Sequence, residues 1–298
     1  MTVRLALLQM ASDASEAPSA RIPRILGRVE EVAPQADLLV LPELWIPGAF
    51  DLVTAREVAA PLESPVLDTL RNIARTASTW IHAGSYAERT DDGRTFNTSV
   101  LIDDTGAVIT TYRKRHLFGF ETGERTLMSG GEDLVVVDTP LGRTGIATCY
   151  DIRFPEMFRL LVDRGATAFL LCAGWPTLRI EAWRVLCRAR AAENLAFVVA
   201  CNGVGAHADV VLGGHSVVVD PVGDVIAEAG YAEEVLWAEV DPAAPATWRA
   251  DFPALEDRIP DPDRPRPTGL GLTGTGDRPV AGLGASGRAD PTPQWGGR

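Results

Sequence analysis

The stretch that decides the fold is Gly145-Ile146-Ala147-Thr148-Cys149, a strand-like run that leads into Tyr150-Asp151-Ile152-Arg153-Phe154-Pro155-Glu156. The pattern predicts a sharp strand-to-helix turn with Cys149 at its apex. A thiol at a helix N-terminus meets unpaired N–H groups and the positive end of the helix dipole, both of which favour the thiolate. The alternative is that Cys149 is one of four cysteines that serve as small hydrophobic residues.

Strand and helix patterns alternate on both sides of this turn. Turn residues 104–106 and 220–224 also predict two hairpins, so antiparallel pairs are expected among parallel ones. The alternation predicts a layered α/β fold. Strand-like runs lie at 4–9, 37–41, 80–86, 97–103, 107–113, 134–139, 144–149, 168–172, 196–201, 215–219 and 225–228, and helical patterns at 20–32, 65–78, 155–164 and 179–194.

The chain of 298 residues is expected to form one domain, 1–258, followed by a tail, 259–298. Hydrophobic residues make up 46% of the chain, which is enough for a substantial core. From Pro260 onward, Pro and Gly supply 16 of 39 residues, and large apolar side chains are scarce. Such a segment buries too little surface to offset its ordering entropy, so we predict a Gly/Pro-rich flexible tail, with a partner-wrapping arm as the alternative.

Charge and cysteine spacing exclude several classes of protein. The formal net charge of −12 argues against a nucleic-acid or anionic-membrane partner. The four cysteines have no C-x-x-C spacing, so neither a disulfide framework nor a zinc site is predicted. The N-terminus lacks the pattern of a signal peptide, and no apolar run approaches the roughly 20 residues of a membrane span. We therefore expect a soluble cytoplasmic protein.

Two charged residues follow other predicted strands. Glu43 comes just after the apolar run 37–41, where a carboxylate is either paired or functional, because open α/β sheets bind ligands at this edge. Lys114 follows the run 107–113 within a basic cluster, for which a solvated surface is the alternative. A thiol, a carboxylate and an ammonium together are a complete set for acyl transfer: nucleophile, base and oxyanion partner.

Three blocks of the chain resemble the signatures of the nitrilase superfamily, the carbon-nitrogen hydrolases, and they occur in the same order. The resemblance covers about residues 1–245 and implies a four-layer αββα sandwich that dimerises through helices. The blocks are Leu41-Pro42-Glu43, Tyr112-Arg113-Lys114-Arg115-His116-Leu117-Phe118 and Gly145-Ile146-Ala147-Thr148-Cys149-Tyr150-Asp151-Ile152-Arg153-Phe154-Pro155-Glu156.

The resemblance also implies roles for these residues. Glu43 would be the general base, Lys114 the oxyanion stabiliser and Cys149 the nucleophile. Glu124 fits the family's second glutamate better than Glu121 does, and Tyr150 would add its backbone N–H to the oxyanion hole. The chemistry would need neither a metal nor an organic cofactor.

The residues after Cys149 bear on the substrate. Nitrilases proper tend to carry Trp-Glu there, whereas Tyr150-Asp151-Ile152-Arg153-Phe154 is similar to omega-amidases and deaminated-glutathione amidases, whose substrates carry a carboxylate. Arg153 would bind that carboxylate, or else pair with Asp151 or Glu156. Trp175 would line the pocket or pack in the core.

These observations predict thioester-mediated hydrolysis of a small, carboxylate-bearing amide by a homodimer or a higher homo-oligomer. An N-carbamoyl acid amidohydrolase and a nitrilase are alternatives on the same fold. A non-catalytic interaction protein that recruits partners through its tail is the alternative from another class.

Overall fold

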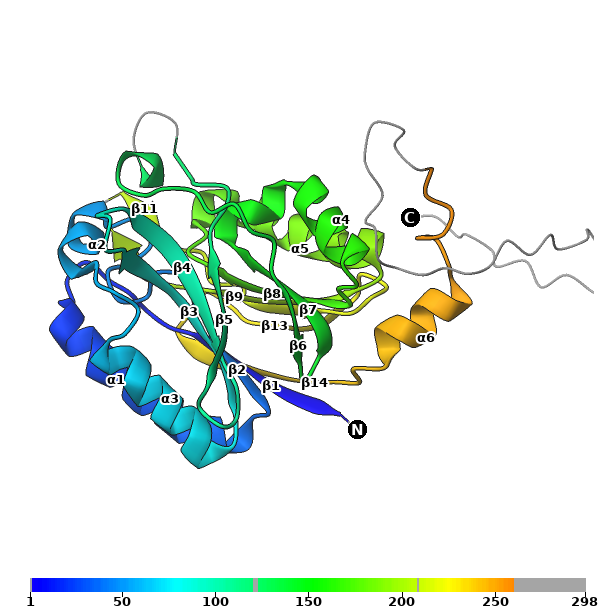
Figure 1. The fold of residues 1–298 in the computed structure, drawn as a ribbon, viewed down its shortest axis with the longest axis horizontal. Helices are drawn as coiled ribbons and strands as arrows, with labels where there is room; N and C mark the ends of the chain where they lie inside the picture. Colours follow the sequence, from blue (N-terminus) through cyan, green and yellow to red (C-terminus); the bar gives the residue numbers. More distant parts are fainter. Residues whose placement is uncertain (1, 120–122, 208, 260–298) are drawn as a thin grey trace, which may run out of the picture. The chain divides into compact units, whose positions relative to one another are not determined.

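The computed structural model describes residues 2–119, 123–207 and 209–259, and it contains two six-stranded sheets (Figure 1). The first sheet has the order β14-β1-β2-β3-β4-β5, and the second β13-β12-β9-β8-β7-β6. The first sheet comprises β14 (Glu234–Val240), β1 (Val3–Gln9), β2 (Leu38–Val40), β3 (Trp80–Arg89), β4 (Thr95–Ile102) and β5 (Val108–Arg113). The second comprises β13 (Val225–Glu228), β12 (Val217–Val219), β9 (Phe197–Asn202), β8 (Ala168–Ala173), β7 (Gly142–Thr148) and β6 (Val136–Thr139).

Each sheet has a parallel centre and antiparallel edges. In the first, β2 runs parallel to β1 and β3, and β14, β4 and β5 are added antiparallel. In the second, β7, β8 and β9 are parallel, and β6, β12 and β13 are antiparallel. A short ribbon, β10 (Ala206–His207) with β11 (Val210–Val211), lies apart from both. The predicted mixture of parallel and antiparallel pairs is confirmed.

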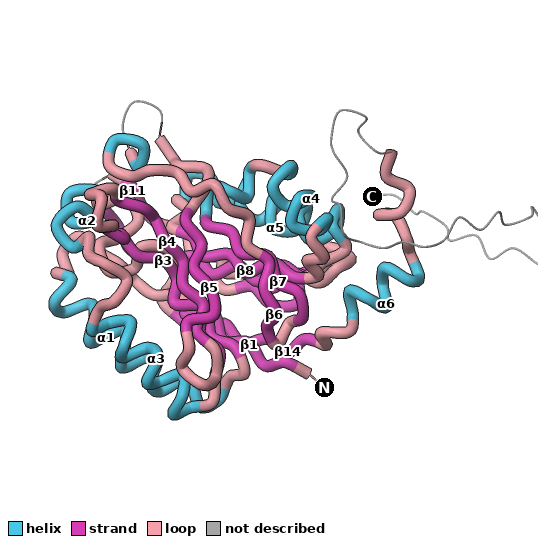
Figure 2. Tube along the Cα trace, viewed as in Figure 1, coloured by secondary structure: helices cyan, strands magenta, loops and turns pink. Residues whose placement is uncertain are grey.

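Helices cover the outer faces of the sheets, so that helix, sheet, sheet and helix form four layers (Figures 1 and 2). Helices α1 (Pro18–Val32) and α3 (Pro65–Ala77) flank the first sheet, and α4 (Pro155–Asp163) and α5 (Ile180–Asn194) the second. Two shorter helices are α2 (Leu52–Val58) and α6 (Ala244–Asp251). The predicted four-layer αββα sandwich is confirmed.

The strand β2 shows why the layers form. Leu38 and Val40 point into the apolar cluster between the two sheets, whereas Leu39 points into the cluster beneath α1 and α3. Successive side chains of a strand face opposite sides, so a wholly apolar strand is stable only when both faces are covered. Helix α3 supplies one cover with a buried stripe at helical spacing: Leu67, Leu70, Ile73 and Ala74.

The topology brings several chain segments to one edge of the sandwich. The parallel strands β2, β7 and β8 end there, and β2 is followed by Glu43, β7 by Cys149 and β8 by Trp175. Strand β5 ends one residue before Lys114. The carboxyl ends of parallel strands are where open α/β folds bind ligands, so this edge is the expected place for a site.

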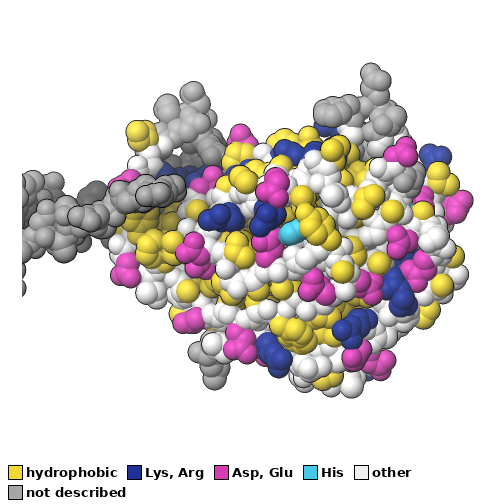
Figure 3. Space-filling model, turned by 180° about the vertical axis from the view of Figure 1, so that it is seen from behind, with side chains coloured by type: hydrophobic (Ala, Val, Ile, Leu, Met, Phe, Trp, Pro, Cys, Tyr) yellow, Lys and Arg dark blue, Asp and Glu magenta, His cyan; other side chains and the backbone are white. Residues whose placement is uncertain are grey.

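On the face drawn in Figure 3, acidic and basic side chains are interspersed with apolar ones. No helix in the described ranges combines the length and apolar character needed to cross a bilayer. The division into a domain at 1–258 and a flexible tail stays a prediction, because 260–298 lie outside the described residues.

Candidate active site

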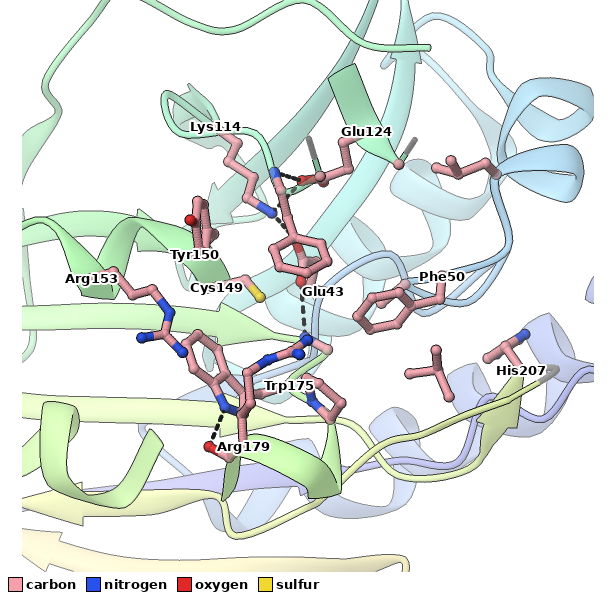
Figure 4. Close-up of a pocket in the computed structure, with 18 of the residues that line it drawn as sticks. Glu43, Phe50, Lys114, Glu124, Cys149, Tyr150, Arg153, Trp175, Arg179 and His207 are labelled. Carbon is pink, nitrogen blue, oxygen red and sulfur yellow. Dashed lines mark hydrogen bonds and ion pairs between the residues drawn. The ribbon is translucent and has the colours of Figure 1, made fainter. Parts of the chain in front are cut away.

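Lys114 lies between two carboxylates, those of Glu43 and Glu124 (Figure 4). Its Nζ is 2.7 Å from Oε1 of Glu43 and 2.7 Å from Oε2 of Glu124, and all three side chains are buried. Asn97, on β4, donates from its amide nitrogen to Oε1 of Glu43 at 2.8 Å and to Oε1 of Glu124 at 2.7 Å. Glu43 and Glu124 are therefore bridged by two groups, the Lys114 ammonium and the Asn97 side-chain amide.

These contacts decide the charge of Lys114. Burial favours the neutral amine, but the negative charges of Glu124 and then Glu43 outweigh burial and hold the pKa of Lys114 well above its usual value. The ammonium is therefore charged at neutral pH although its side chain is only 1% exposed. A fixed positive charge in a water-poor site can stabilise an oxyanion far more strongly than one in bulk water.

Glu43 and Glu124 are each held by a backbone N–H as well. Gly174, after β8, donates to Oε2 of Glu43 at 2.8 Å, and Phe118 donates to Oε2 of Glu124 at 2.7 Å. Burial raises the pKa of Glu124, and the charge of Glu43 raises it further against the opposing effect of Lys114. The structure places Glu124 beside Lys114, whereas Glu121 lies outside the described residues. The role of Glu124 as the second glutamate that the resemblance implies stays a prediction.

Cys149 occupies a strained turn directly after β7. Its φ is 47°, in the left-handed region, and it begins the five-residue 3-10 helix Cys149–Arg153. Asp151 stabilises this turn through a capping box with Thr148, whose backbone N–H donates to Asp151 Oδ2 at 2.9 Å. A non-glycine residue keeps such a backbone only where its surroundings fix it, and strain of this kind is typical of functional sites.

The state of the Cys149 thiol differs from the expectation of a helix-stabilised thiolate. Burial raises the pKa of Cys149 well above its ordinary value, and the negative charge of Glu43 raises it further, while Lys114 acts in the opposite direction. The prediction was wrong because the turn is a short 3-10 helix, with α4 beginning only at Pro155, and because the thiol is 7% exposed beside a carboxylate. The resting thiol is protonated and needs a base.

A cavity of about 550 Å³ opens over these residues. Tyr150, Arg153 and Trp175, the three residues predicted to bind substrate, all line it. Arg153 pairs with neither Asp151 nor Glu156 in the described chain; its guanidinium lies 4.8 Å from the centre of the Trp175 ring. Trp175 both lines the cavity and packs, since its ring centre is 5.6 Å from that of Trp183.

Sequence reasoning missed other residues of the site. Asn97 gave no signal, because one amide within an apolar strand pattern does not reveal that it faces two acids. Arg179 was assigned to the start of a helix, whereas it ends the 3-10 turn Thr177–Arg179 and lines the cavity. Phe118 and His207 also line the cavity from segments on either side of it. Their placement depends on long-range packing of loops that no local pattern encodes.

A four-layer αββα sandwich with a cysteine, a lysine and a glutamate after its strands, and a second glutamate on a nearby 3-10 turn, defines a class of thiol-dependent hydrolases. The comparison with known sequences identifies that class. The carbon-nitrogen hydrolase family profile matches residues 4–250, and the chain belongs to this family. It is therefore an enzyme, a carbon-nitrogen hydrolase, as the resemblance of its three blocks predicted.

Several known proteins are similar to this chain. The 2-oxoglutaramate amidase of Paenarthrobacter nicotinovorans is 42% identical over 264 residues, which cover 86% of this chain and 90% of that protein. Nit3 of Saccharomyces cerevisiae, a member of branch 10 of the nitrilase superfamily, is 30% identical with a TM-score of 0.76, covering 85% of this chain and 94% of that one.

A structure from another amidase bears on the nucleophile. A variant of the amidase from Nesterenkonia sp. AN1, 27% identical with a TM-score of 0.72, covers 86% of this chain and 95% of its own. It carries the acetamide moiety of fluoroacetamide covalently added at its active-site cysteine.

Proposed function

We propose that this enzyme hydrolyses the amide of a small acid that carries a free carboxylate, through a thioester on Cys149. The observation that carries the proposal is the Glu43–Lys114–Glu124 cluster, which lies with Cys149 in a cavity that also holds an arginine without an acidic partner among the described residues. The similarity to a 2-oxoglutaramate amidase supports a 2-oxo acid amide as the first substrate to test.

The first half-reaction forms the thioester. Glu43 accepts the proton of the Cys149 thiol, and the sulfur attacks the amide carbonyl carbon to form a C–S bond. The negative charge that develops on the carbonyl oxygen is stabilised by Lys114 and by the backbone N–H of Tyr150. Collapse of this intermediate breaks the C–N bond, and Glu43 returns the proton to the leaving nitrogen, which departs as ammonia.

The second half-reaction releases the acid. Glu43 deprotonates a water molecule, whose oxygen attacks the thioester carbon. The C–S bond breaks, the product leaves as a carboxylic acid, and the proton on Glu43 returns to sulfur. Glu124 acts through Lys114 by holding the ammonium charged and in place, so it is a positioning residue. Protein groups and water balance every step, and the proposal invokes no metal or organic cofactor.

Arg153 is assigned to the substrate carboxylate. Its guanidinium is held over the Trp175 ring, which leaves its N–H groups available to the cavity. Guanidinium geometry matches a carboxylate in a bidentate pair, which adds orientation as well as attraction. A substrate bound by its carboxylate at Arg153 would present the amide at its other end to Cys149.

A panel of substrates tests the proposal against its same-fold alternatives. Purified enzyme is offered 2-oxoglutaramate, an N-carbamoyl amino acid and a nitrile of matched chain length, and ammonia release is measured. We expect kcat/KM for the carboxylate amide to exceed that for the other two by at least about tenfold, since selectivity follows differential transition-state binding. A higher kcat/KM for the carbamoyl acid would identify the enzyme as an N-carbamoyl acid amidohydrolase, and a higher kcat/KM for the nitrile would identify it as a nitrilase.

The role of the Cys149 thiol is tested by Cys149→Ala. The exchange removes the nucleophile and little volume, so the variant should fold and show no ammonia release. Hydrolysis by the variant at the wild-type rate would contradict a role for this thiol.

Assembly and location belong to the same proposal. We place the enzyme in the cytoplasm as a homodimer. Its four cysteines are all free, as is usual in a reducing compartment. Val185 on α5 is 63% exposed and Leu178 in the preceding turn 88%, and we assign these two apolar side chains to the interface with the second copy. Light scattering should give twice the monomer mass of 31.9 kDa, and a monomer at micromolar concentration would refute the dimer.

A further inference from the structure

A second arginine, Arg179, lines the catalytic cavity together with Arg153. Neither side chain has an ion pair or hydrogen bond to a described residue, although most other arginines of the described chain have one. The protein as a whole carries a formal net charge of −12. Asp209 also lines the cavity, but it pairs with neither arginine. Two guanidiniums without an acidic partner among the described residues make this part of the cavity more favourable to anions than the acidic surface around it.

The backbone of Arg179 is fixed from both sides. Its N–H donates to the carbonyl of Pro176 at 3.0 Å, and its carbonyl accepts from the indole Nε1 of Trp175 at 2.8 Å. Trp175 is itself anchored, because its backbone N–H donates to Oδ1 of Asn202 at 2.6 Å. The side chain of Arg179 therefore extends from a rigid base, and less entropy is lost when its guanidinium binds a ligand.

The Arg179 side chain reaches across the cavity. Its guanidinium carbon lies 5.3 Å from the centre of the Phe118 ring, on the segment that follows β5 of the other sheet. The Phe118 ring also contacts Tyr150 edge to face at 5.3 Å, next to the nucleophile, and the Phe118 N–H binds Glu124. Arg179 is thereby positioned over the walls of the catalytic cavity and not over the outer surface.

Trp175 connects the two arginines. The Arg153 guanidinium stacks on the Trp175 ring, and the Trp175 indole N–H donates a hydrogen bond to the backbone carbonyl of Arg179. In Figure 4, Arg153 and Arg179 flank Trp175, and the sulfur of Cys149 points toward this group. A carboxylate bound between the two guanidiniums would gain an attraction to each of them.

We propose that Arg179 is a second carboxylate-binding residue and forms, with Arg153, a two-arginine clamp on the acid end of the substrate. The inference rests on the proposed function and adds a second residue that would recognise the carboxylate of the substrate. The enzyme would prefer amides whose far end is a carboxylate, and would discriminate against neutral amides of the same length, because these leave two guanidiniums without partners.

A pair of covalent labels tests the clamp without turnover. 5-Chloro-4-oxopentanoate presents a ketone carbonyl, a leaving chloride and a carboxylate two methylenes away, and its methyl ester is the neutral counterpart. The Cys149 sulfur forms a C–S bond as the C–Cl bond breaks, chloride leaves, and Glu43 takes the thiol proton. The second-order labelling rates of both reagents at Cys149 are measured by mass spectrometry, and their acid-to-ester ratio is the readout.

Arg179→Gln should lower the acid-to-ester ratio by about tenfold or more, the size expected for a lost hydrogen bond to a charged group. Its rate with the ester should stay within about twofold of wild type, because the thiol and its base are untouched. Arg179→Lys should recover part of the ratio. The matched control is Arg188→Gln, which removes the same charge from an exposed position on α5 and should leave both rates unchanged.

Two results would overturn the clamp. An unchanged ratio in Arg179→Gln would show that Arg179 does not bind the carboxylate, and an equal fall of both rates would show that it only supports the Phe118 segment. Failure of the proposed function is a separate result: wild-type enzyme that releases no ammonia from any carboxylate amide would refute the amidase assignment, whatever the labelling ratio.

Discussion

At the scale of single residues, the site depends on how a buried ammonium is compensated. Lys114 has carboxylates on two sides and reaches no bulk water, so its charge persists only while both acids remain. Removing one partner of a buried ion pair leaves a charge without compensation, which costs more than the pair contributes. Glu124 and Asn97 are therefore as necessary to the electrostatics of the site as Lys114 and Cys149, which would contact the reacting carbonyl.

The exchange Glu124→Gln tests this account of Lys114. It keeps the size of the side chain and removes one of the two charges that raise the pKa of the lysine. We expect kcat/KM for the amide to fall at least about 100-fold, as for loss of an oxyanion partner. Glu132→Gln, at an exposed position in the next loop, is the control and should be near wild type. A Glu124→Gln enzyme with more than half of the wild-type kcat/KM would exclude the positioning role.

Some residues of the site could be predicted from the sequence, and others could not. Glu43, Lys114 and Cys149 each follow a recognisable strand within a recognisable block, so their meeting was predictable. Asn97 and Arg179 come from different sheets and enter the site through packing, which their local patterns do not record. The protonation state of Cys149 could not be predicted from the sequence either, because it depends on the burial of the thiol and on its distance to Glu43. The roles assigned to these residues stay predictions.

At the scale of elements, the 3-10 helix Cys149–Arg153 is held by one carboxylate. Asp151 accepts from the Tyr112 hydroxyl at 2.7 Å, from the His116 backbone N–H at 3.0 Å and from the Thr148 backbone N–H at 2.9 Å, and it contacts His116 Nδ1 at 2.7 Å. The left-handed backbone of Cys149 lies within this network. The turn is thus fastened to β5 and the segment after it.

Asp151→Asn should weaken this turn. An amide has one acceptor oxygen instead of two and brings two donors of its own, so several of the bonds to a fully buried group are lost. We expect the free energy of unfolding to fall by about 2–4 kcal/mol in urea titrations, and the labelling rate at Cys149 to fall with it. Asp138→Asn, an exposed position on β6, is the control. Unchanged unfolding of Asp151→Asn would contradict the account of the turn.

His82 on β3 predicts a pH dependence of stability. It is fully buried, its ring nitrogens have no hydrogen-bond partner among the described residues, and burial lowers its pKa to about 4. The folded chain therefore keeps a neutral imidazole that the unfolded chain protonates below about pH 6.5. The contribution of the neutral His82 imidazole to the free energy of unfolding is fully present above that pH. It is lost as the pH falls from about 6.5 toward 4.

Replacing His82 by Leu removes this contribution. Between pH 7 and pH 5, wild type should lose about 2 kcal/mol more free energy of unfolding than His82→Leu, as the difference in pKa requires. Urea titrations of both proteins at the two pH values give the number, and groups common to both proteins cancel. Equal losses would show that the His82 imidazole does not titrate differently in the two states.

Elements were predictable where a pattern repeats locally. Helix α3 shows an apolar stripe bounded by a Ser64 cap, whose hydroxyl accepts from the Leu67 N–H, and the strands of the second sheet are apolar runs between turns. Strand β14 and helix α6 were missed. β14 pairs with β1 from the other end of the chain, and α6 is short with few buried residues, so neither shows in a local window.

At the scale of the whole molecule, the layered fold explains why the site lies at one edge. Strands from both sheets end there, and the residues that follow them face one another across the cavity. The class of fold, the family and the enzyme class were predictable from three ordered blocks. The dimer, the cytoplasmic location and the tail were expected from the resemblance or from composition, and they stay predictions.

Removal of 259–298 tests the predicted tail. The site lies within 43–210, so an enzyme of residues 1–258 should keep its melting temperature within about 2 °C and its kcat/KM within about twofold, as expected for removal of a segment that adds no core. Thermal unfolding and ammonia release measure both. Loss of activity or of the oligomer on truncation would instead favour the partner-wrapping arm.

The most direct test of the central claim is acid-quenched mass spectrometry during turnover of 2-oxoglutaramate. The account predicts a mass increase equal to the acyl group on the peptide that contains Cys149, with ammonia released alongside, and neither in Cys149→Ala. An acyl group on Cys172, Cys187 or Cys201, or turnover that persists in Cys149→Ala, would contradict it.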